Sequence, residues 1–339
     1  MAKSELGICL IGCGRAGMIH ARNFKNRVPG AKMVAVADVV EEAAKSAASE
    51  LGINAWYTDY RKALENDSVD AVIVVSPTDL HRDIVINCAN AGKHVFCEKP
   101  MAMNTQECDE MIEACNKNGV KLQIGFMRRF DAGFIEAKKL LDSGAIGKLV
   151  QIHSCTRGPS KPQKWMYDIK KSNGILAEVN SHDIDSIRWF AGDEIEELYA
   201  VAGNFRNPDA AEEYPDYYDS VLMTGKFKNG VQFSIDGAAY VQYGYDSRME
   251  IIGTKGVIHV GRTEANSVKC TTVEHGTATR FVDSWRTLFT EAYLAEDISF
   301  AKSILNDTEP LVTGIDGRQA VRIVEAGNQS IKNKSIIKL

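Results

Sequence analysis

The chain has 339 residues, of which 45% are hydrophobic and 25% are charged, as in an ordinary globular protein. At roughly 150 residues per domain, this length predicts two domains and excludes a disulfide-bonded miniprotein. The 40 basic and 45 acidic side chains give a formal net charge of −5, which argues against nucleic acid as a partner.

Apolar runs are short throughout the sequence. Ala71–Val75 is an example, whereas a membrane span needs roughly 20 apolar residues. We therefore expect no association with a membrane. The N-terminal segment has too short an apolar stretch for a secretory signal, so we expect a cytoplasmic protein.

Short apolar runs alternate with amphipathic segments in the first third of the chain. This alternation is typical of parallel strands joined by crossover helices, and the continuous apolar runs indicate strands buried on both faces. The predicted strands are Leu6–Ile11, Met33–Asp38, Ala71–Val75, His94–Cys97 and Lys121–Gly125. The predicted helices are 16–27, 40–51, 80–91 and 104–118. The pattern predicts an α/β domain with a doubly wound parallel sheet over residues 1–125.

Strands dominate the remainder of the chain. They are predicted at Leu149–Cys155, Glu197–Ala202, Ser220–Phe227, Val231–Ala238, Arg248–Gly253 and Val257–Gly261. Asn229-Gly230 predicts a hairpin, because these residues tolerate the positive φ of a tight turn. Helices are predicted at 288–306 and 317–332. We predict an α+β domain over residues 126–339, with a large, mostly antiparallel open sheet, helices on one face, and last helices able to pack on the first domain.

The eight cysteines carry no CxxC pair and lie mostly inside apolar segments. They are Cys9, Cys13, Cys88, Cys97, Cys108, Cys115, Cys155 and Cys270. Buried, reduced thiols of a cytosolic protein are the expected state. A zinc site needs a tighter cluster of Cys and His, so we expect no metal.

A glycine motif, Gly12-Cys13-Gly14-Arg15-Ala16-Gly17, follows the first predicted strand and opens the first predicted helix. Chance alone gives roughly 0.2 such strings in a chain of this composition, so the argument rests on that context. Gly12 would make the tight turn, Gly14 would let the backbone approach a pyrophosphate, and Gly17 would let helix and strand pack closely. The helix N-terminus adds unpaired N–H groups. The alternative is a purely structural glycine turn.

Asp38 ends the second predicted strand, about 20 residues after the last glycine of the motif. A carboxylate at this position accepts hydrogen bonds from a ribose 2′-hydroxyl and repels a 2′-phosphate. Val39 and Val40 follow, with no arginine to hold a phosphate. We therefore predict NAD rather than NADP as the cofactor.

Two further strand ends carry polar residues. The segment Ser76-Pro77-Thr78-Asp79-Leu80-His81 lies outside the carboxyl end of its strand, where ligands bind open parallel sheets. His81 either contacts the cofactor or caps a helix. Lys99 lies between a strand end and Pro100, whose ring restricts the lysine backbone to extended geometry and so directs its ammonium group. Taken alone, such a lysine is usually a solvated charge.

With these motifs the sequence resembles the glucose–fructose oxidoreductase/inositol dehydrogenase/rhizopine catabolism family of dehydrogenases. The resemblance rests on GCGRAGMIH, Asp38, SPTDLH and the EKP triplet at 98–100, and it covers nearly the whole chain. GFMRRFD at 125–131 and YGYD at 243–246 resemble the inositol dehydrogenase branch. The family resemblance implies a Rossmann domain followed by a domain with a large open sheet, through which we expect a homodimer or homotetramer.

The resemblance implies functional residues at the matching positions. Lys99 is implied as the catalytic lysine and His182 as the catalytic histidine. Glu178 stands where the family usually has Asp, and Asn180 where Gly is common. The implied cofactor contacts are Gly12, Gly14, Arg15, Ala16, Gly17, Asp38, Ser76, Pro77, Thr78, His81 and Glu98. The predicted substrate contacts are Met127, Arg129, Arg157, Trp165, Asp185, Tyr243 and Tyr245.

Spacing supports part of this site independently. Glu178, His182 and Asp185 lie at i, i+4 and i+7, which would place them on one face of a single helix that ends at Gly192. A Glu and a His at this spacing can also form an ordinary surface pair, and a lone histidine can be a core residue.

The predicted function is NAD-dependent oxidation of a secondary ring hydroxyl in a cyclic polyol, most simply myo-inositol to a ketoinositol. His182 would act as general base, since an unperturbed pKa of ~6.5 suits neutral pH. Lys99 would stabilise alkoxide charge, and Glu178 would orient His182 or a neighbouring hydroxyl. One alternative is a dehydrogenase of a sugar or glycoside ring hydroxyl, for example at C3. Another is an NAD-binding regulator without redox activity, or an NAD-dependent glycoside hydrolase.

Overall fold

The computed structural model describes residues 4–339. Residues 1–3, part of the segment considered as a targeting signal, lie outside that range. The chain divides into two compact units. Among the described residues, the first unit comprises 4–130 and 291–321, and the second comprises 131–290 and 322–339. Within residues 4–339, no helix combines the length and the apolar character that crossing a membrane requires.

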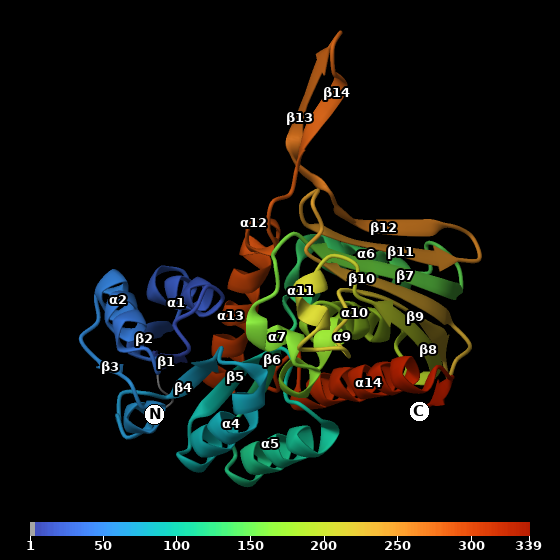
Figure 1. The fold of residues 1–339 in the computed structure, drawn as a ribbon. Coiled ribbons are helices and arrows are strands. Elements are labelled where there is room, and N and C mark those ends of the chain that lie inside the picture. The colour runs from blue at the N-terminus through green and yellow to red at the C-terminus, as the bar shows by residue number, and fades with distance from the viewer. Residues whose placement is uncertain (1–3) are drawn as a thin grey trace. The chain divides into compact units, whose positions relative to one another are not determined.

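A wholly parallel sheet forms the centre of the first unit, as the sequence predicts, but it has six strands because the short β3 joins the five that were predicted (Figure 1). Its order, β3-β2-β1-β4-β5-β6, is that of a doubly wound Rossmann sheet. The strands are β1 (Leu6–Ile11), β2 (Ala31–Ala37), β3 (Trp56–Tyr57), β4 (Ala71–Val74), β5 (His94–Glu98) and β6 (Leu122–Gly125). Every residue of β1 and β4 is buried, because helices cover both faces of the sheet.

Four helices of the first unit begin and end close to the predicted limits, and a fifth, the short helix over residues 60–64, was not predicted. They are α1 (Gly17–Asn26), α2 (Glu41–Leu51), α3 (Tyr60–Leu64), α4 (His81–Asn90) and α5 (Thr105–Lys117), with 3-10 turns η1 (Thr78–Leu80) and η2 (Met127–Phe130). From the C-terminal part, α13 (Thr290–Leu305) adds Phe300 and Ala301 to the core around β1. Helix α14 (Gly314–Asn333) begins in the first unit and ends in the second.

The second unit contains a seven-stranded mixed sheet with the order β12-β11-β7-β10-β9-β8-β15. Only β7 and β10 pair in parallel; the other neighbours are antiparallel, in agreement with the predicted open sheet. The strands are β7 (Leu149–Gly158), β8 (Ile195–Gly203), β9 (Ser220–Phe227), β10 (Gln232–Ala239), β11 (Asp246–Gly253), β12 (Val257–Arg262) and β15 (Ile337–Lys338). Gly230, with a φ of +87°, turns the predicted hairpin between β9 and β10.

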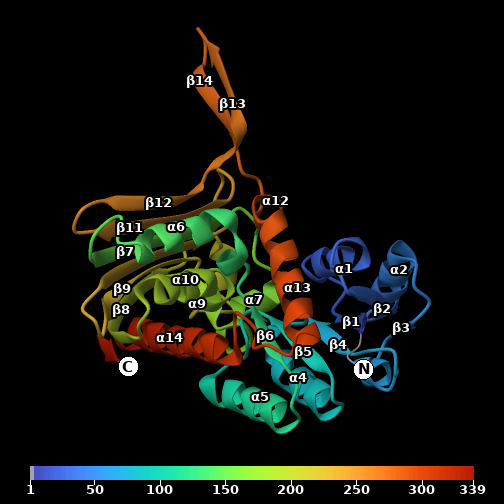
Figure 2. The ribbon, with the colours of Figure 1, turned by 180° about the vertical axis from the view of Figure 1, so that it is seen from behind.

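Long helices cover one face of this sheet (Figure 2). Gly133 of α6 approaches Val260 of β12, and Gly327 of α14 approaches Met223 of β9. The helices of the unit are α6 (Ala132–Asp142), α7 (Lys164–Tyr167), α8 (Ile169–Ser172), α9 (Gly174–Glu178), α10 (Ser181–Ala191), α11 (Pro208–Ala211) and α12 (Trp285–Leu288). We call the other side of the sheet the open face; it carries the side chains of Tyr199, Val201 and Leu222, each more than a third exposed.

A two-stranded hairpin extends from the end of the sheet, and the sequence analysis did not predict it (Figure 1). Its strands are β13 (Glu264–Thr272) and β14 (Gly276–Phe281), and nearly all of their residues are exposed. Both strands consist mostly of polar and small residues, so they lack the alternation of apolar and polar residues that marks a half-buried strand.

Candidate active site

The glycine loop between β1 and α1 has the backbone shape that its sequence predicts. Gly12 has a φ of +97°, and a Cβ there would lie 2.2 Å from the Val75 carbonyl oxygen. A Cβ on Gly17 would lie 2.0 Å from the Gly12 carbonyl oxygen, so the close packing of helix and strand requires glycine. Around Gly14 a Cβ would meet nothing within 4 Å, and Arg15 is exposed. The loop therefore leaves open space at the N-terminus of α1, where a pyrophosphate fits.

Asp38 directly follows β2, and two backbone groups orient its carboxylate. Oδ2 accepts the Cys13 N–H at 2.8 Å, and Oδ1 accepts the Val40 N–H at 2.9 Å. Val39 and Val40 are exposed, and the next basic residue in the chain is Lys45. A carboxylate tied to the glycine loop, with no adjacent cation, fits a ribose diol better than a 2′-phosphate.

The loop after β4 is connected to the loop after β5 through His81. The His81 ring is buried, with Nδ1 2.8 Å from the Pro100 carbonyl oxygen and Nε2 2.9 Å from the Ser76 carbonyl oxygen. The ring thus holds two loops together rather than capping a helix, and its burial lowers its pKa. Pro77 remains exposed beside it, whereas Thr78 is buried.

Lys99 follows β5 and is partly exposed, and its peptide bond to Pro100 is cis. The preceding residue, Glu98, is buried, and its carboxylate is engaged on two sides. Oε2 accepts the Lys99 backbone N–H at 2.9 Å, and Oε1 lies 3.2 Å from His20 Nε2. The sequence suggested Glu98 as a cofactor contact; the structure directs its carboxylate toward α1 and toward the backbone of its own loop.

Sequence reasoning missed His20 and Asp297. Both are fully buried, and His20 Nδ1 lies 2.6 Å from Asp297 Oδ1. Burial alone would lower the pKa of His20, but the charges and hydrogen bonds of Asp297 and Glu98 raise it well above its usual value. A signal was present, because His20 lies four residues before the apolar Phe24 on the core side of the first helix.

Glu178, His182 and Asp185 do not share one helix, so that prediction is wrong. Glu178 ends α9, whereas His182 and Asp185 lie on α10. Between them the N–H groups of Val179 and Asn180 both bond to one carbonyl, which interrupts the helical pattern. His182 and Asp185 are buried, and Glu178 is partly exposed.

Asn180 lies at this interruption, directly before α10. Its side chain lies against Gly237 of β10, where an added Cβ would be 1.8 Å from Asn180 Oδ1. Asn180 Nδ2 donates to Asp183 Oδ2 at 2.8 Å, and the Ser154 hydroxyl donates to Asp183 Oδ1 at 2.5 Å. Asp183 thereby ties α10 to β7 and fixes the backbone that carries His182.

Two predicted substrate residues, Met127 and Arg129, lie in η2 of the first unit and are buried. Arg129 Nη2 donates to Asp316 Oδ1 at 2.8 Å, and Asp316 Oδ2 also accepts the Thr313 hydroxyl at 3.0 Å. The guanidinium is therefore held against the start of α14, and the sequence gave no indication of Asp316 as its partner.

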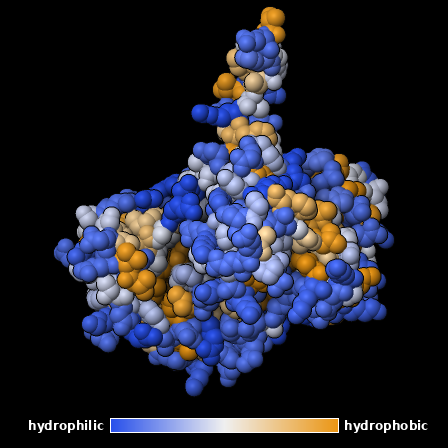
Figure 3. Space-filling view, viewed as in Figure 1, coloured by the Kyte–Doolittle hydropathy of each residue, from blue (hydrophilic) through white to orange (hydrophobic). Residues whose placement is uncertain are grey.

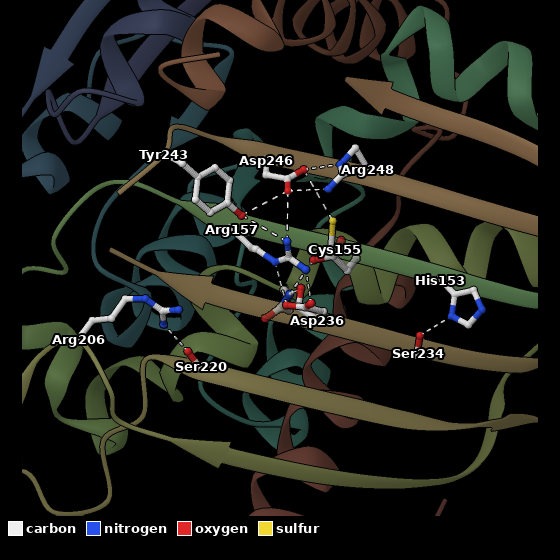
Figure 4. Close-up of polar contacts among 12 residues, drawn as sticks. His153, Cys155, Arg157, Arg206, Ser220, Ser234, Asp236, Tyr243, Asp246 and Arg248 are labelled. Carbon is white, nitrogen blue, oxygen red and sulfur yellow. Dashed lines mark hydrogen bonds and ion pairs between the residues drawn. The ribbon is translucent and has the colours of Figure 1, made fainter. Parts of the chain in front are cut away.

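Arg157 and Tyr243 lie on the open face of the sheet, away from α9 and α10 (Figure 4). Arg157 Nε donates to Asp236 at 3.1 Å, and Nη1 donates to Asp246 at 3.4 Å. The Tyr243 hydroxyl donates to the same Asp246 at 3.4 Å, and Arg248 completes the group. The structure does not bring Arg157 and Tyr243 together with Glu178 and His182, because the sheet lies between them.

The remaining predicted substrate residues have separate environments. Trp165, in α7, is partly exposed and donates its indole N–H to Gln163 at 3.0 Å. Tyr245 is buried, and its backbone N–H bonds the Val282 carbonyl at 2.7 Å.

None of the eight cysteines forms a disulfide, and five of them are buried in the first unit. Burial raises the pKa of Cys9 to about 12. Across residues 4–339, the structure holds no group of three or more His, Cys, Asp or Glu arranged to bind a metal.

Comparison with known proteins covers both units. Residues 6–126 match the profile of an oxidoreductase family with an NAD-binding Rossmann fold, and residues 134–259 match the GFO/IDH/MocA C-terminal domain. A scyllo-inositol 2-dehydrogenase (NAD(+)) of Bacillus subtilis is 35% identical over 99% of this chain and 96% of its own length. A myo-inositol 2-dehydrogenase of Thermotoga maritima is 35% identical over 98% of both chains.

A similar solved structure is scyllo-inositol dehydrogenase from Lactobacillus casei with bound NAD(H) and scyllo-inositol. It has a TM-score of 0.90, 30% sequence identity, and coverage of 98% of this chain and 99% of that one. Myo-inositol 2-dehydrogenase from Lactobacillus plantarum gives a TM-score of 0.91 at 29% identity, with coverage of 99% of both chains.

Proposed function

Because the chain belongs to the glucose–fructose oxidoreductase/inositol dehydrogenase/rhizopine catabolism family of NAD-dependent oxidoreductases, we propose that it oxidises a ring hydroxyl of an inositol. Myo-inositol, oxidised to a ketoinositol, is the proposed first substrate. The observation that carries this proposal is full-length identity of 35% with both a myo- and a scyllo-inositol 2-dehydrogenase.

Lys99 and His182 divide the chemistry in this proposal. Oxidation of a secondary alcohol removes a hydroxyl proton and a hydride, and bound NAD supplies the hydride acceptor. Because an alcohol pKa lies far above neutral, a base and a cation are both needed. His182 takes the hydroxyl proton, and the Lys99 ammonium donates to the same oxygen and stabilises its developing charge, a contribution of about 3–4 kcal/mol for such contacts.

Glu178 is proposed to orient the substrate or His182. It ends α9, so its position relative to His182 is set by the Asn180 interruption rather than by one helical turn. The extra methylene relative to Asp moves its carboxylate, which favours a second candidate, a dehydrogenase of a sugar or glycoside ring hydroxyl.

Substrate contacts are proposed for Asp185, Trp165, Tyr245, Met127 and Arg129. Arg157 and Tyr243 are left out, because their polar groups are bound to Asp236 and Asp246 on the open face.

The proposal is tested by following NAD reduction with myo-inositol, scyllo-inositol, glucose and methyl glucosides. We expect the inositols to give the highest kcat/KM and NADP to replace NAD poorly. Higher kcat/KM with a glucoside would favour the second candidate. An exchange-resistant bound NAD together with glycoside cleavage would overturn dehydrogenase activity altogether.

We propose that the open face binds a second copy of the chain, giving a homodimer or homotetramer. Support comes from exposed apolar side chains on that face, Tyr199, Val201 and Leu222 among them, and hydrophobic residues gather over this part of the surface (Figure 3). We also propose a cytoplasmic location, because eight cysteines outside any disulfide suit a reducing compartment.

A further inference from the structure

Three ionisable side chains form a buried chain of contacts inside the first unit, next to Lys99. Asp297 of α13, His20 of α1 and Glu98 at the end of β5 follow one another through contacts of 2.6 Å and 3.2 Å. Asp297 and His20 are fully buried, and Glu98 is nearly so. The chemistry proposed above gives no task to His20 or Asp297, although burying such groups is costly unless they are paired.

Two flanking carboxylates favour a doubly protonated imidazole. A neutral histidine has one N–H, so it can donate to only one of two flanking carboxylates. Each ring nitrogen of His20 faces a carboxylate oxygen, and both contacts are favourable together when the ring carries both protons. The imidazolium therefore donates to Asp297 and to Glu98 at once.

The ring is also fixed in place by its surroundings. It packs against Phe96 with a centroid separation of 4.9 Å and edge-on against Tyr293 at 5.5 Å. Asn23 Nδ2 donates to the second Asp297 oxygen at 2.8 Å, so Asp297 cannot turn away without losing that bond. His20 is thus held from α1, α13 and the sheet, and Glu98 receives its N–H from a rigid donor.

Glu98 transmits this order to Lys99. Its second oxygen accepts the Lys99 backbone N–H at 2.9 Å. On the other side of the carboxyl group, Gly125 of β6 leaves no spare room, since a Cβ there would lie 2.9 Å from the Glu98 carboxyl carbon. The Glu98 carboxylate is confined between His20, Gly125 and the Lys99 amide. The nitrogen of that amide is bonded to the Lys99 Cα, which carries the lysine side chain.

We propose that His20 is a positioning residue for the oxidation. It holds the Glu98 carboxylate against the Lys99 amide and thereby sets the direction in which the Lys99 ammonium leaves the sheet. Asp297 supports this role by fixing the opposite side of the His20 ring. This inference rests on the proposed role of Lys99 as the group that stabilises the alkoxide.

The test is a double-mutant cycle between His20→Gln and Lys99→Met, with myo-inositol and NAD as the probes. If His20 acts through Lys99, His20→Gln lowers kcat by about a hundredfold, as a displaced catalytic group does. KM for myo-inositol and the Kd for NADH, measured by fluorescence titration, change by less than about threefold, because the His20 ring is fully buried within the first unit. In the Lys99→Met background the same substitution has no further effect on kcat.

Controls separate positioning from damage to the fold. His94 belongs to the same sheet and accepts a hydrogen bond from the Lys121 backbone N–H. His94→Gln should therefore leave kcat unchanged. Glu98→Gln keeps an oxygen for the Lys99 amide and offers its amide group to the ring, so it should retain more activity than His20→Gln. If His20→Gln does not fold, Asp297→Asn replaces it in the double-mutant cycle with Lys99→Met.

The outcomes distinguish a failure of the positioning role of His20 from a failure of the proposed function. Equal losses from His20→Gln in both backgrounds, or a loss confined to KM or to NADH affinity, overturn the positioning role alone. A fully active Lys99→Met enzyme overturns the proposed function and this inference together.

Discussion

Thr156 and Arg157 are consecutive residues of β7, and their side chains leave opposite faces of the seven-stranded sheet. Thr156 is 2% exposed on the face that the long helices cover. Arg157 bonds to Asp236 and Asp246 on the open face. Because side chains alternate along a strand, one position decides whether a residue can reach the side of the sheet that carries α9 and α10.

This placement predicts that Arg157→Ala leaves substrate binding intact. KM for myo-inositol should change by less than about twofold, while the apparent free energy of unfolding falls by ~1 kcal/mol, because Asp236 loses its cation in a partly exposed setting. Arg248→Ala, which removes another partner of Asp246, is the matched control. A tenfold rise in KM for myo-inositol with Arg157→Ala, but not with Arg248→Ala, would show that Arg157 contributes to substrate binding.

Asp38 should control the choice between NAD and NADP. Asp38→Ala combined with Val39→Arg removes the carboxylate that repels a 2′-phosphate and adds a cation in an exposed position. We expect the ratio of kcat/KM for NAD over NADP to fall by more than about tenfold. Glu41→Ala, which removes a nearby acidic group from α2, controls for a general change in charge. An unchanged ratio would show that selectivity lies elsewhere.

Glu178 should influence which hydroxyl is oxidised. Shortening it with Glu178→Asp withdraws the carboxylate by one methylene and leaves its charge in place. We expect kcat to remain within about tenfold while the ratio of rates for myo-inositol and glucose changes, whereas Glu178→Gln lowers kcat for both. The measurement is kcat/KM for each substrate under saturating NAD. Equal scaling of both substrates by Glu178→Asp would argue against a role in presenting the hydroxyl.

His20 makes a prediction for stability as a function of pH. Its folded pKa lies well above 6.5, because Asp297 and Glu98 outweigh the opposing effect of burial. Folding therefore binds a proton in the range above pH ~6.5, and the free energy of unfolding should fall by up to about 1.4 kcal/mol per pH unit there. Burial also raises the pKa of Asp297, which contributes with the same sign at lower pH.

Thermal midpoints from pH 6 to 8.5 at constant ionic strength measure this effect. The wild-type midpoint should decline more steeply above pH 6.5 than that of His20→Gln. His94→Gln is a control of opposite sign, since burial lowers the pKa of His94 and its contribution changes only below about pH 6.5. Parallel curves for the wild type and His20→Gln would show that the ring is not charged in the folded state.

The first unit was predictable because its signals are local. Continuous apolar strands, the glycine motif and Asp38 each depend on neighbours in sequence, and the structure places them as expected. Contacts between distant segments gave no such signal. Asn180, at the break between α9 and α10, lies against Gly237 of a distant strand, and His20 contacts Asp297 across 277 positions of the chain. The hairpin of β13 and β14 was missed because its polar residues lie exposed on both faces.

The open face makes the last prediction. Leu222 is 57% exposed in β9, and a second copy covering the open face would bury it. Leu222→Lys places a charge in that interface, so the dissociation constant of the oligomer should rise by about tenfold or more. Leu311→Lys is a matched control, because Leu311 is 59% exposed and belongs to the first unit. Light scattering after size exclusion should give a multiple of 37.3 kDa for the wild type and the control, and the monomer mass for Leu222→Lys at low concentration. A monomeric wild type at micromolar concentration would leave the open face without its proposed occupant.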